Sequence, residues 1–179
     1  MNKALSLQKA VVAELCTINT NLALGYIYDR MGNFYINADK NAEALDAFDR
    51  AISIYEADPV IFSMYEAKSR LCSTLYYATK VSFELKDWDK IVYYSKKYFE
   101  LAEYLAEKYA SPGQIYRLIE AYHIFATTKE EHSDAERKSL PLYEKLCRIR
   151  PHDERYKNML FTVTGTRKGH KKKNKAKKQ

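Results

Sequence analysis

The sequence contains little glycine, proline or cysteine. Only 5 glycines and 4 prolines occur among 179 residues, whereas the tight turns between β-strands need such residues often. The 3 cysteines lie far apart and form no CxxC pair, so we expect reduced, buried thiols and no disulfide framework. These shortages predict an all-α protein of the cytoplasm, or of the nucleus if the source is eukaryotic.

Long apolar runs are also missing. No stretch approaches the roughly 18 consecutive apolar residues that a membrane-spanning helix needs, so we expect no membrane partner. The first nine residues include Ser6, Gln8 and Lys9, and these polar residues argue against a secretory signal.

Acidic residues are absent from the C-terminal segment 165–179, although the whole chain has 23 of them against 30 basic residues and a net charge of +7. That segment holds eight cations, and subtracting them leaves about −1 for residues 1–164. The body is therefore not a basic nucleic-acid-binding domain. We expect a helical domain over 1–164 and a disordered, Lys-rich tail over 165–179. The eight cations are Arg167, Lys168, Lys171, Lys172, Lys173, Lys175, Lys177 and Lys178.

Apolar residues recur at intervals of three and four along most of the chain, which is typical of helices with one buried face. We expect a helix over 3–31, weakened at Gly32, a loop over 37–41 and a second helix over 44–55. Asp58 followed by Pro59 predicts a third helix that ends near Lys86. The later helix starts are predicted at Asp87, Ser111, Ser133 and Asp153, where Ser111 and Ser133 form capping boxes with Gln114 and Glu136.

The first two predicted helices resemble a tetratricopeptide repeat. Leu24, Gly25 and Tyr28 match the first helix of that repeat, with about seven inserted residues, Tyr35 to Asn41, before the second. An alternative register places Gly32 and Tyr35 on the first helix and removes the insertion. The matches on the second helix are Ala44, Phe48, Ala51 and Pro59.

The resemblance extends more weakly over about residues 17–164. Thr79 and Ser139 stand where the family has small residues. The segment 153–164 resembles the helix that covers a terminal repeat. The resemblance implies antiparallel helical hairpins stacked as about three repeats, with a C-terminal capping helix.

Sixteen tyrosines are more than a small core needs. We expect Tyr94, Tyr98 and Tyr143 to pack between helices, with each hydroxyl reaching an edge. Tyrosine and arginine are also the residues that most often anchor interfaces. The resemblance implies a concave groove lined by first-helix side chains, which here are Tyr26, Asp29, Arg30, Tyr76, Tyr77, Lys80 and Phe83.

These features predict a non-catalytic adaptor or scaffold that binds a peptide or helix of another protein in that groove. The family's carboxylate clamp needs lysine and asparagine where this chain has Leu22, Ala23 and Tyr26, so a receptor for chaperone tails is disfavoured. Half of the groove residues could equally be core residues.

Motifs for catalysis are absent: the sequence has no glycine-rich phosphate loop, no HExxH and no nucleophile elbow. His132 could join Glu131 or Asp134 in a metal site, but the three lie at a link between helices where solvated charge is ordinary. We expect no enzymatic activity, no cofactor and no metal.

The tail supports an alternative function. Lysines without interleaved aromatic residues can contact RNA or DNA phosphates nonspecifically, but offer no base stacking or readout. The protein would then be a nucleic-acid- or ribosome-associated factor. A nuclear import signal and a solvated end without a role remain open for the same residues.

Overall fold

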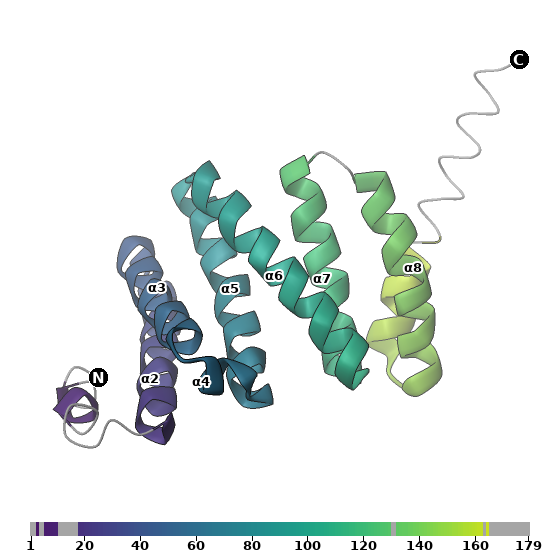
Figure 1. The fold of residues 1–179 in the computed structure, drawn as a ribbon. Coiled ribbons are helices and arrows are strands. Elements are labelled where there is room, and N and C mark those ends of the chain that lie inside the picture. Colours follow the sequence, from purple (N-terminus) through teal and green to yellow (C-terminus); the bar gives the residue numbers. More distant parts are fainter. Residues whose placement is uncertain (1–2, 4–5, 11–17, 130–131, 163, 165–179) are drawn as a thin grey trace, which may run out of the picture. The chain divides into compact units, whose positions relative to one another are not determined.

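The computed structural model describes residues 3, 6–10, 18–129, 132–162 and 164, and these residues are almost entirely helical (Figure 1). No strand occurs among them, so the all-α prediction is confirmed for the described part of the chain. The chain forms two compact units, Met1–Leu101 and Ala102–Gln179. The predicted tail, 165–179, lies outside the described residues.

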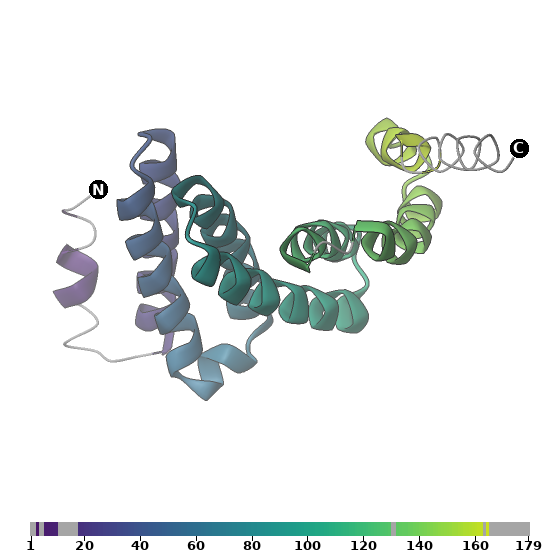
Figure 2. The ribbon, with the colours of Figure 1, turned by 90° about the horizontal axis from the view of Figure 1, so that it is seen from above.

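The first unit is built on a hairpin of α2 (Ile18–Asn37) and α3 (Asn41–Ala57), which lie side by side (Figure 2). Gly25, near the start of α2, meets Tyr55, near the end of α3. A β-carbon on Gly25 would lie 2.7 Å from Cε1 of Tyr55, and one on Gly32 would lie still closer to the ring of Phe48. The two helices are therefore antiparallel, and they approach each other closely at both glycines.

The link between these helices is shorter than predicted. Only residues 38–40 lie between α2 and α3. The backbone N–H groups of residues 38 and 40 donate to the carbonyl of Tyr35 at 3.1 and 2.9 Å, and Asp39 has a left-handed backbone with φ 54°. The loop predicted over 37–41 is therefore limited to 38–40, and the predicted weakening at Gly32 is wrong, because α2 continues through Gly32, which packs on Phe48.

A short helix, α4 (Pro59–Ser63), precedes α5 (Tyr65–Leu85). Asp58 caps α4 as predicted, since its Oδ1 accepts a hydrogen bond from the N–H two residues later at 2.7 Å. The backbone of Met64 is extended (φ −73°, ψ 137°), and an extended residue interrupts the helical hydrogen-bond ladder. The prediction of one continuous helix from Pro59 is therefore wrong.

The next helix, α6 (Trp88–Tyr109), follows a sharp turn. Lys86 ends α5 with a left-handed backbone, φ 57°. Oδ1 of Asp87 then accepts a hydrogen bond from the N–H of Lys90 at 3.1 Å. The predicted cap at Asp87 is confirmed.

Three tyrosines that were predicted to pack between helices are buried: Tyr94, Tyr98 and Tyr143 are 2%, 1% and 7% exposed. The Tyr94 hydroxyl donates to Asp49 of α3, which also pairs with Lys90 at 3.4 Å. Burial, followed by the hydrogen bond to Asp49, raises the pKa of Tyr94. Tyr94 therefore remains a protonated donor that holds α6 to α3.

The second unit contains α7 (Pro112–Lys129), α8 (His132–Ile149) and helical residues 154–162. Ser111 caps α7, because its Oγ accepts from the N–H of Gln114 at 3.3 Å. The predicted start at Ser133 is wrong, since α8 already includes His132. The core cluster is Ile115, Ile119, Tyr143 and Leu146, with Tyr116, Leu142, Tyr156, Met159 and Leu160 packed against it.

The helices start at regular intervals along the sequence. Helices α5 and α7 start at residues 65 and 112, which are 47 residues apart. The start of α6 follows that of α3 by 47 residues. The helical pairs therefore recur with a period of about 47 residues, and the first interval includes the extra helix α4.

Candidate functional site

Side-chain contacts join α2 to α5 in the first unit. The Thr74 hydroxyl donates to Oδ1 of Asp29 at 2.9 Å, and the guanidinium of Arg70 lies 4.3 Å from the ring centroid of Tyr26. Tyr26 contacts Arg70, and Asp29, which lies further along α2, contacts Thr74, which lies further along α5. The two helices therefore run in the same direction here. We call the surface formed by Tyr26, Asp29, Arg70 and Thr74 the α2–α5 seam.

The three groove residues predicted on α2 lie at or beside this seam. Tyr26 is 40% exposed, Arg30 is exposed and Asp29 is half-buried. Tyr26 and Asp29 contact α5 directly, through Arg70 and Thr74. The structure therefore brings two of the three predicted α2 residues together with α5.

The four groove residues predicted on α5 divide between two neighbouring helices. Tyr77 is 36% exposed and stacks on Phe48 of α3, with ring centroids 6.2 Å apart. Tyr76 instead contacts Tyr98 of α6 at 5.6 Å. The rings of Tyr76 and Tyr77 meet edge to face at 5.2 Å, so this pair separates the two sides of α5.

Lys80 and Phe83 belong to the α6 side of α5. The Lys80 ammonium lies 5.4 Å from the Tyr76 ring centroid, and the Phe83 ring lies 6.3 Å from that of Trp88. Their described contacts do not link them to α2. Of the predicted residues, Tyr26 and Asp29 therefore contact α5 from α2, and Tyr77 contacts α3 from α5.

Sequence analysis did not include Arg70 and Thr74 among the site residues. Glu66 and Arg70 are four positions apart, a spacing typical of ion pairs on one helix face, and they form such a pair at 2.9 Å. That spacing was an available signal for Arg70. Thr74 had no local signal, because its partner Asp29 is 45 residues away.

The Asp29 carboxyl is held in an unfavourable electrostatic environment. Burial raises its pKa above the ordinary value, although the hydrogen bond from Thr74 and the charges of Arg70 and Arg30 oppose this effect. Burial disfavours the charged form of a carboxyl. The seam therefore contains a negative charge that its neighbours compensate incompletely.

Replacing Asp29 with asparagine should raise the melting temperature near pH 7, and the difference should shrink toward pH 4. A carboxyl whose pKa is raised by folding stabilises the native state at low pH, and this contribution is lost as the pH rises through the folded-state pKa. Asparagine keeps an oxygen for Thr74 and carries no charge. Thermal melts of both proteins between pH 4 and pH 8 test this. A less stable variant at pH 7 would show that the attraction to Arg70 dominates.

A cavity of about 430 Å³ lies between α2 and α3, away from the seam residues. Burial alone would raise the pKa of Tyr28 in its wall, but hydrogen bonds from Lys9 and Arg50 lower it. Arg50 is itself held by Asp46 at 2.9 Å. The charged rim of this cavity is thus largely engaged in contacts within the chain.

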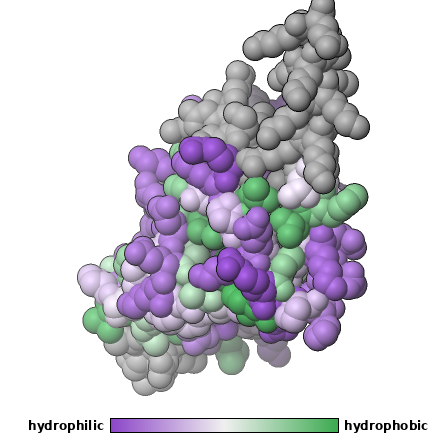
Figure 3. Space-filling model, turned by 90° about the vertical axis from the view of Figure 1, so that its right-hand side faces the viewer, coloured by the Kyte–Doolittle hydropathy of each residue, from purple (hydrophilic) through white to green (hydrophobic). Residues whose placement is uncertain are grey.

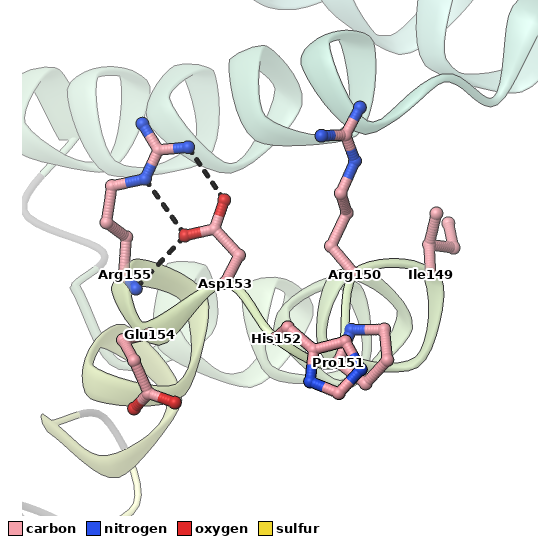
Figure 4. A pocket seen from close by; sticks show the side chains of 7 residues that line it. All are labelled: Ile149, Arg150, Pro151, His152, Asp153, Glu154 and Arg155. Carbon is pink, nitrogen blue, oxygen red and sulfur yellow. Dashed lines mark hydrogen bonds and ion pairs between the residues drawn. The ribbon is translucent and has the colours of Figure 1, made fainter.

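A second cavity, of about 670 Å³, lies in the second unit along residues 149–155. Figure 4 shows that its side chains do not converge: Arg150 and Glu154 extend in different directions. Arg155 binds Asp153 at 2.7 Å, and this hydrogen-bonded guanidinium lowers the pKa of Asp153. Asp153 also accepts from the backbone N–H of Arg155 at 3.1 Å, so its role is to start the following helix.

Exposed apolar side chains of the second unit are scattered. Ile149 and Phe161 are 43% and 76% exposed. Figure 3 shows hydrophobic surface in separate areas between hydrophilic side chains. Isolated exposed apolar residues are ordinary on protein surfaces, so they define no site.

Within the described ranges, no group of three His, Cys, Asp or Glu residues could hold a metal ion. The same residues include no helix that is both long and apolar enough to cross a bilayer. No model of a known protein family matches the chain, and no curated protein matches it either.

Proposed function

We propose that the protein is a non-catalytic adaptor that holds a peptide or helix of another protein against the α2–α5 seam. The observation that carries this proposal is the arrangement of Tyr26 and Arg70 at 4.3 Å, both partly exposed, beside the Asp29–Thr74 hydrogen bond. Tyrosine and arginine are enriched among residues that dominate binding energy. Tyr77 adds a second exposed ring on α5.

The polar groups of the seam support binding more than chemistry. Arg70 binds Glu66 at 2.9 Å, and Asp29 accepts the Thr74 hydrogen bond. The Thr74 hydroxyl has a single hydrogen, which the Asp29 carboxylate and the Arg70 carbonyl at 3.0 Å share, and Thr74 is fully buried. These contacts position side chains across two helices, which suits a recognition surface.

The proposal includes a tetratricopeptide-like stack in the register that has no insertion. Gly32 then takes the small first-helix position and packs on Phe48, and Tyr35 follows one turn later. The period of about 47 residues is longer than the roughly 34 of that family. Helix α4 and helices of 17 to 22 residues account for the extra length.

Replacing Tyr26 with alanine should weaken peptide binding by at least about tenfold, as expected for an anchoring tyrosine. The probe is a set of peptides selected from a displayed random library against the full-length protein, with affinities measured by fluorescence anisotropy. Far-UV circular dichroism should be unchanged, because Tyr26 is 40% exposed.

The matched control for this variant is Tyr93→Ala on α6. Tyr93 is 52% exposed and also carries a cation over its ring, Lys97 at 4.9 Å, but it lies outside the seam. We expect it to bind the peptides like the wild type. Equal affinity of both variants would remove the seam as the binding surface.

For the compartment, we favour the cytoplasm. Cys72 is fully buried and Cys147 is half-buried, and neither of them forms a disulfide, which suits a reducing environment. Cys16 lies outside the described residues.

A second function rests on the charge of the sequence. The segment 165–179 has eight cations and no acidic residue, against about −1 for the rest of the chain. Such a segment is suited to nonspecific contacts with nucleic-acid phosphates. This candidate does not exclude the adaptor, because the two functions would use different parts of the chain.

A further inference from the structure

The Tyr55 hydroxyl is a buried polar group without a partner. Tyr55 is 0% exposed, and its hydroxyl makes no hydrogen bond within the described part of the chain. Its ring lies against Gly25, where a β-carbon would come within 2.7 Å, so the ring has little room to turn. Buried polar groups are nearly always hydrogen-bonded, and this exception therefore needs an explanation.

The Tyr55 ring lies against Gly25, and Asp29 of the α2–α5 seam follows Gly25 by four residues on the same face of α2. The charges of Asp29, Arg70 and Glu66 and the phenol of Tyr26 all act on Tyr55, and burial is the largest cause of its raised pKa. A phenol with a raised pKa stays protonated and can donate a hydrogen bond. Three helices, α2, α3 and α5, therefore contribute polar groups to one place.

Asp29 supplies the complementary group. Its Oδ1 accepts from Thr74 at 2.9 Å, and no hydrogen bond to its Oδ2 is present among the described residues. The carboxylate can therefore accept a second hydrogen bond. The place offers one buried donor, the Tyr55 hydroxyl, and one partly buried acceptor, the Asp29 carboxylate.

We propose that Tyr55 and Asp29 form a subsite that binds an amide group of the partner. An amide has an N–H that can donate to Asp29 and a carbonyl that can accept from Tyr55. A cation would match the carboxylate alone, and an anion would match the hydroxyl alone and be repelled by Asp29. This inference rests on the proposed function and names the chemical group that the seam recognises.

Access to the subsite depends on movable surface side chains. Tyr55 is fully buried, whereas Tyr26 is 40% exposed and the side chains of Arg70 and Glu66 are 33% and 56% exposed. Exposed ion pairs and cation–aromatic contacts are individually weak. The side chains of Arg70 and Tyr26 can therefore be displaced by a bound amide without the loss of a strong contact.

Tyr55→Phe tests the proposal, because it removes only the hydroxyl. We expect an unchanged or higher melting temperature and about tenfold weaker binding of library-selected peptides. The matched control is Tyr94→Phe, which removes a hydroxyl that does have a partner, Asp49. That variant should melt at a lower temperature and bind the peptides normally. A lowered melting temperature for Tyr55→Phe, or unchanged peptide affinity, would overturn the subsite.

Two sources of the amide are distinguished by changes in the peptide. If a side-chain amide binds, replacing one Asn or Gln of the peptide with alanine should cost at least about tenfold in wild-type affinity and clearly less in Tyr55→Phe, where only the hydrogen bond to Asp29 is left to lose. If the backbone binds, N-methylation at one position should do the same. Additive losses in every case would overturn the subsite while leaving the adaptor function intact. If no peptide is selected at all, the adaptor function and the subsite both fail.

Discussion

Replacing Gly25 with leucine should reduce the free energy of unfolding by about 3 kcal/mol, the upper end of the usual range for overpacking a core. Even the first carbon of the new side chain would lie 2.7 Å from Cε1 of Tyr55. Tyr55 is fully buried, so its ring cannot move outward without opening the contact between α2 and α3. Urea and thermal melts followed by circular dichroism measure the effect.

Gly113→Leu is the matched control in the same chain. Gly113 is exposed, lies near the start of α7, and has no atom within 4 Å of the position of an added β-carbon. Because glycine in a helix costs up to about 1 kcal/mol relative to alanine, this variant should be as stable as the wild type or more so. A Gly25→Leu protein that melts like the control would contradict the packing of Tyr55 on α2.

The two glycines of α2 explain why the sequence permits two registers of the repeat. Gly25 and Gly32 are seven residues apart, about two helical turns, and so lie on the same face. The structure uses both, Gly25 against Tyr55 and Gly32 against Phe48. Residue types alone could not choose between the registers, because both positions need a small residue for the same reason.

Local signals in the sequence predicted helix starts well. Asp58, Asp87 and Ser111 each accept the expected backbone hydrogen bond, because capping depends on residues two or three positions apart. The break at Met64 was missed, since neither glycine nor proline marks it. Met64, with its extended backbone, is the single residue that links α4 to α5.

The site was less accessible to sequence analysis than the helices. Tyr26, Asp29 and Tyr77 were identified from the resemblance, but the resemblance grouped them with Tyr76, which contacts α6 instead. A helix presents several faces, and which one meets which neighbour depends on packing between distant segments. No signal in the sequence indicated the proposed subsite at Tyr55, since Tyr55 matches the pattern of an ordinary core residue.

Removing residues 165–179 should abolish most of any nonspecific affinity for RNA without changing helicity or the melting temperature. The deletion takes away eight cations and leaves a net charge of about −1. All the described helices lie before residue 165. If all eight cations met phosphates of a single strand, the slope of log K against log salt concentration would be about −5.6. A slope near half of that value is expected, because a chain segment seldom engages every charge at once.

The measurement is a salt titration of labelled, mixed-sequence single-stranded RNA with the full-length and truncated proteins. A full-length variant with the eight tail cations changed to glutamine keeps the length of the chain and should behave like the truncation, because the interaction depends on charge alone. Peptide binding at the α2–α5 seam should be the same in all three proteins. Equal RNA affinity of the full-length and truncated proteins would refute the contact with phosphates and leave the lysines as an import signal or solvated charge. A slope that persists after truncation would instead place the RNA contact on the nearly neutral body, contrary to its charge.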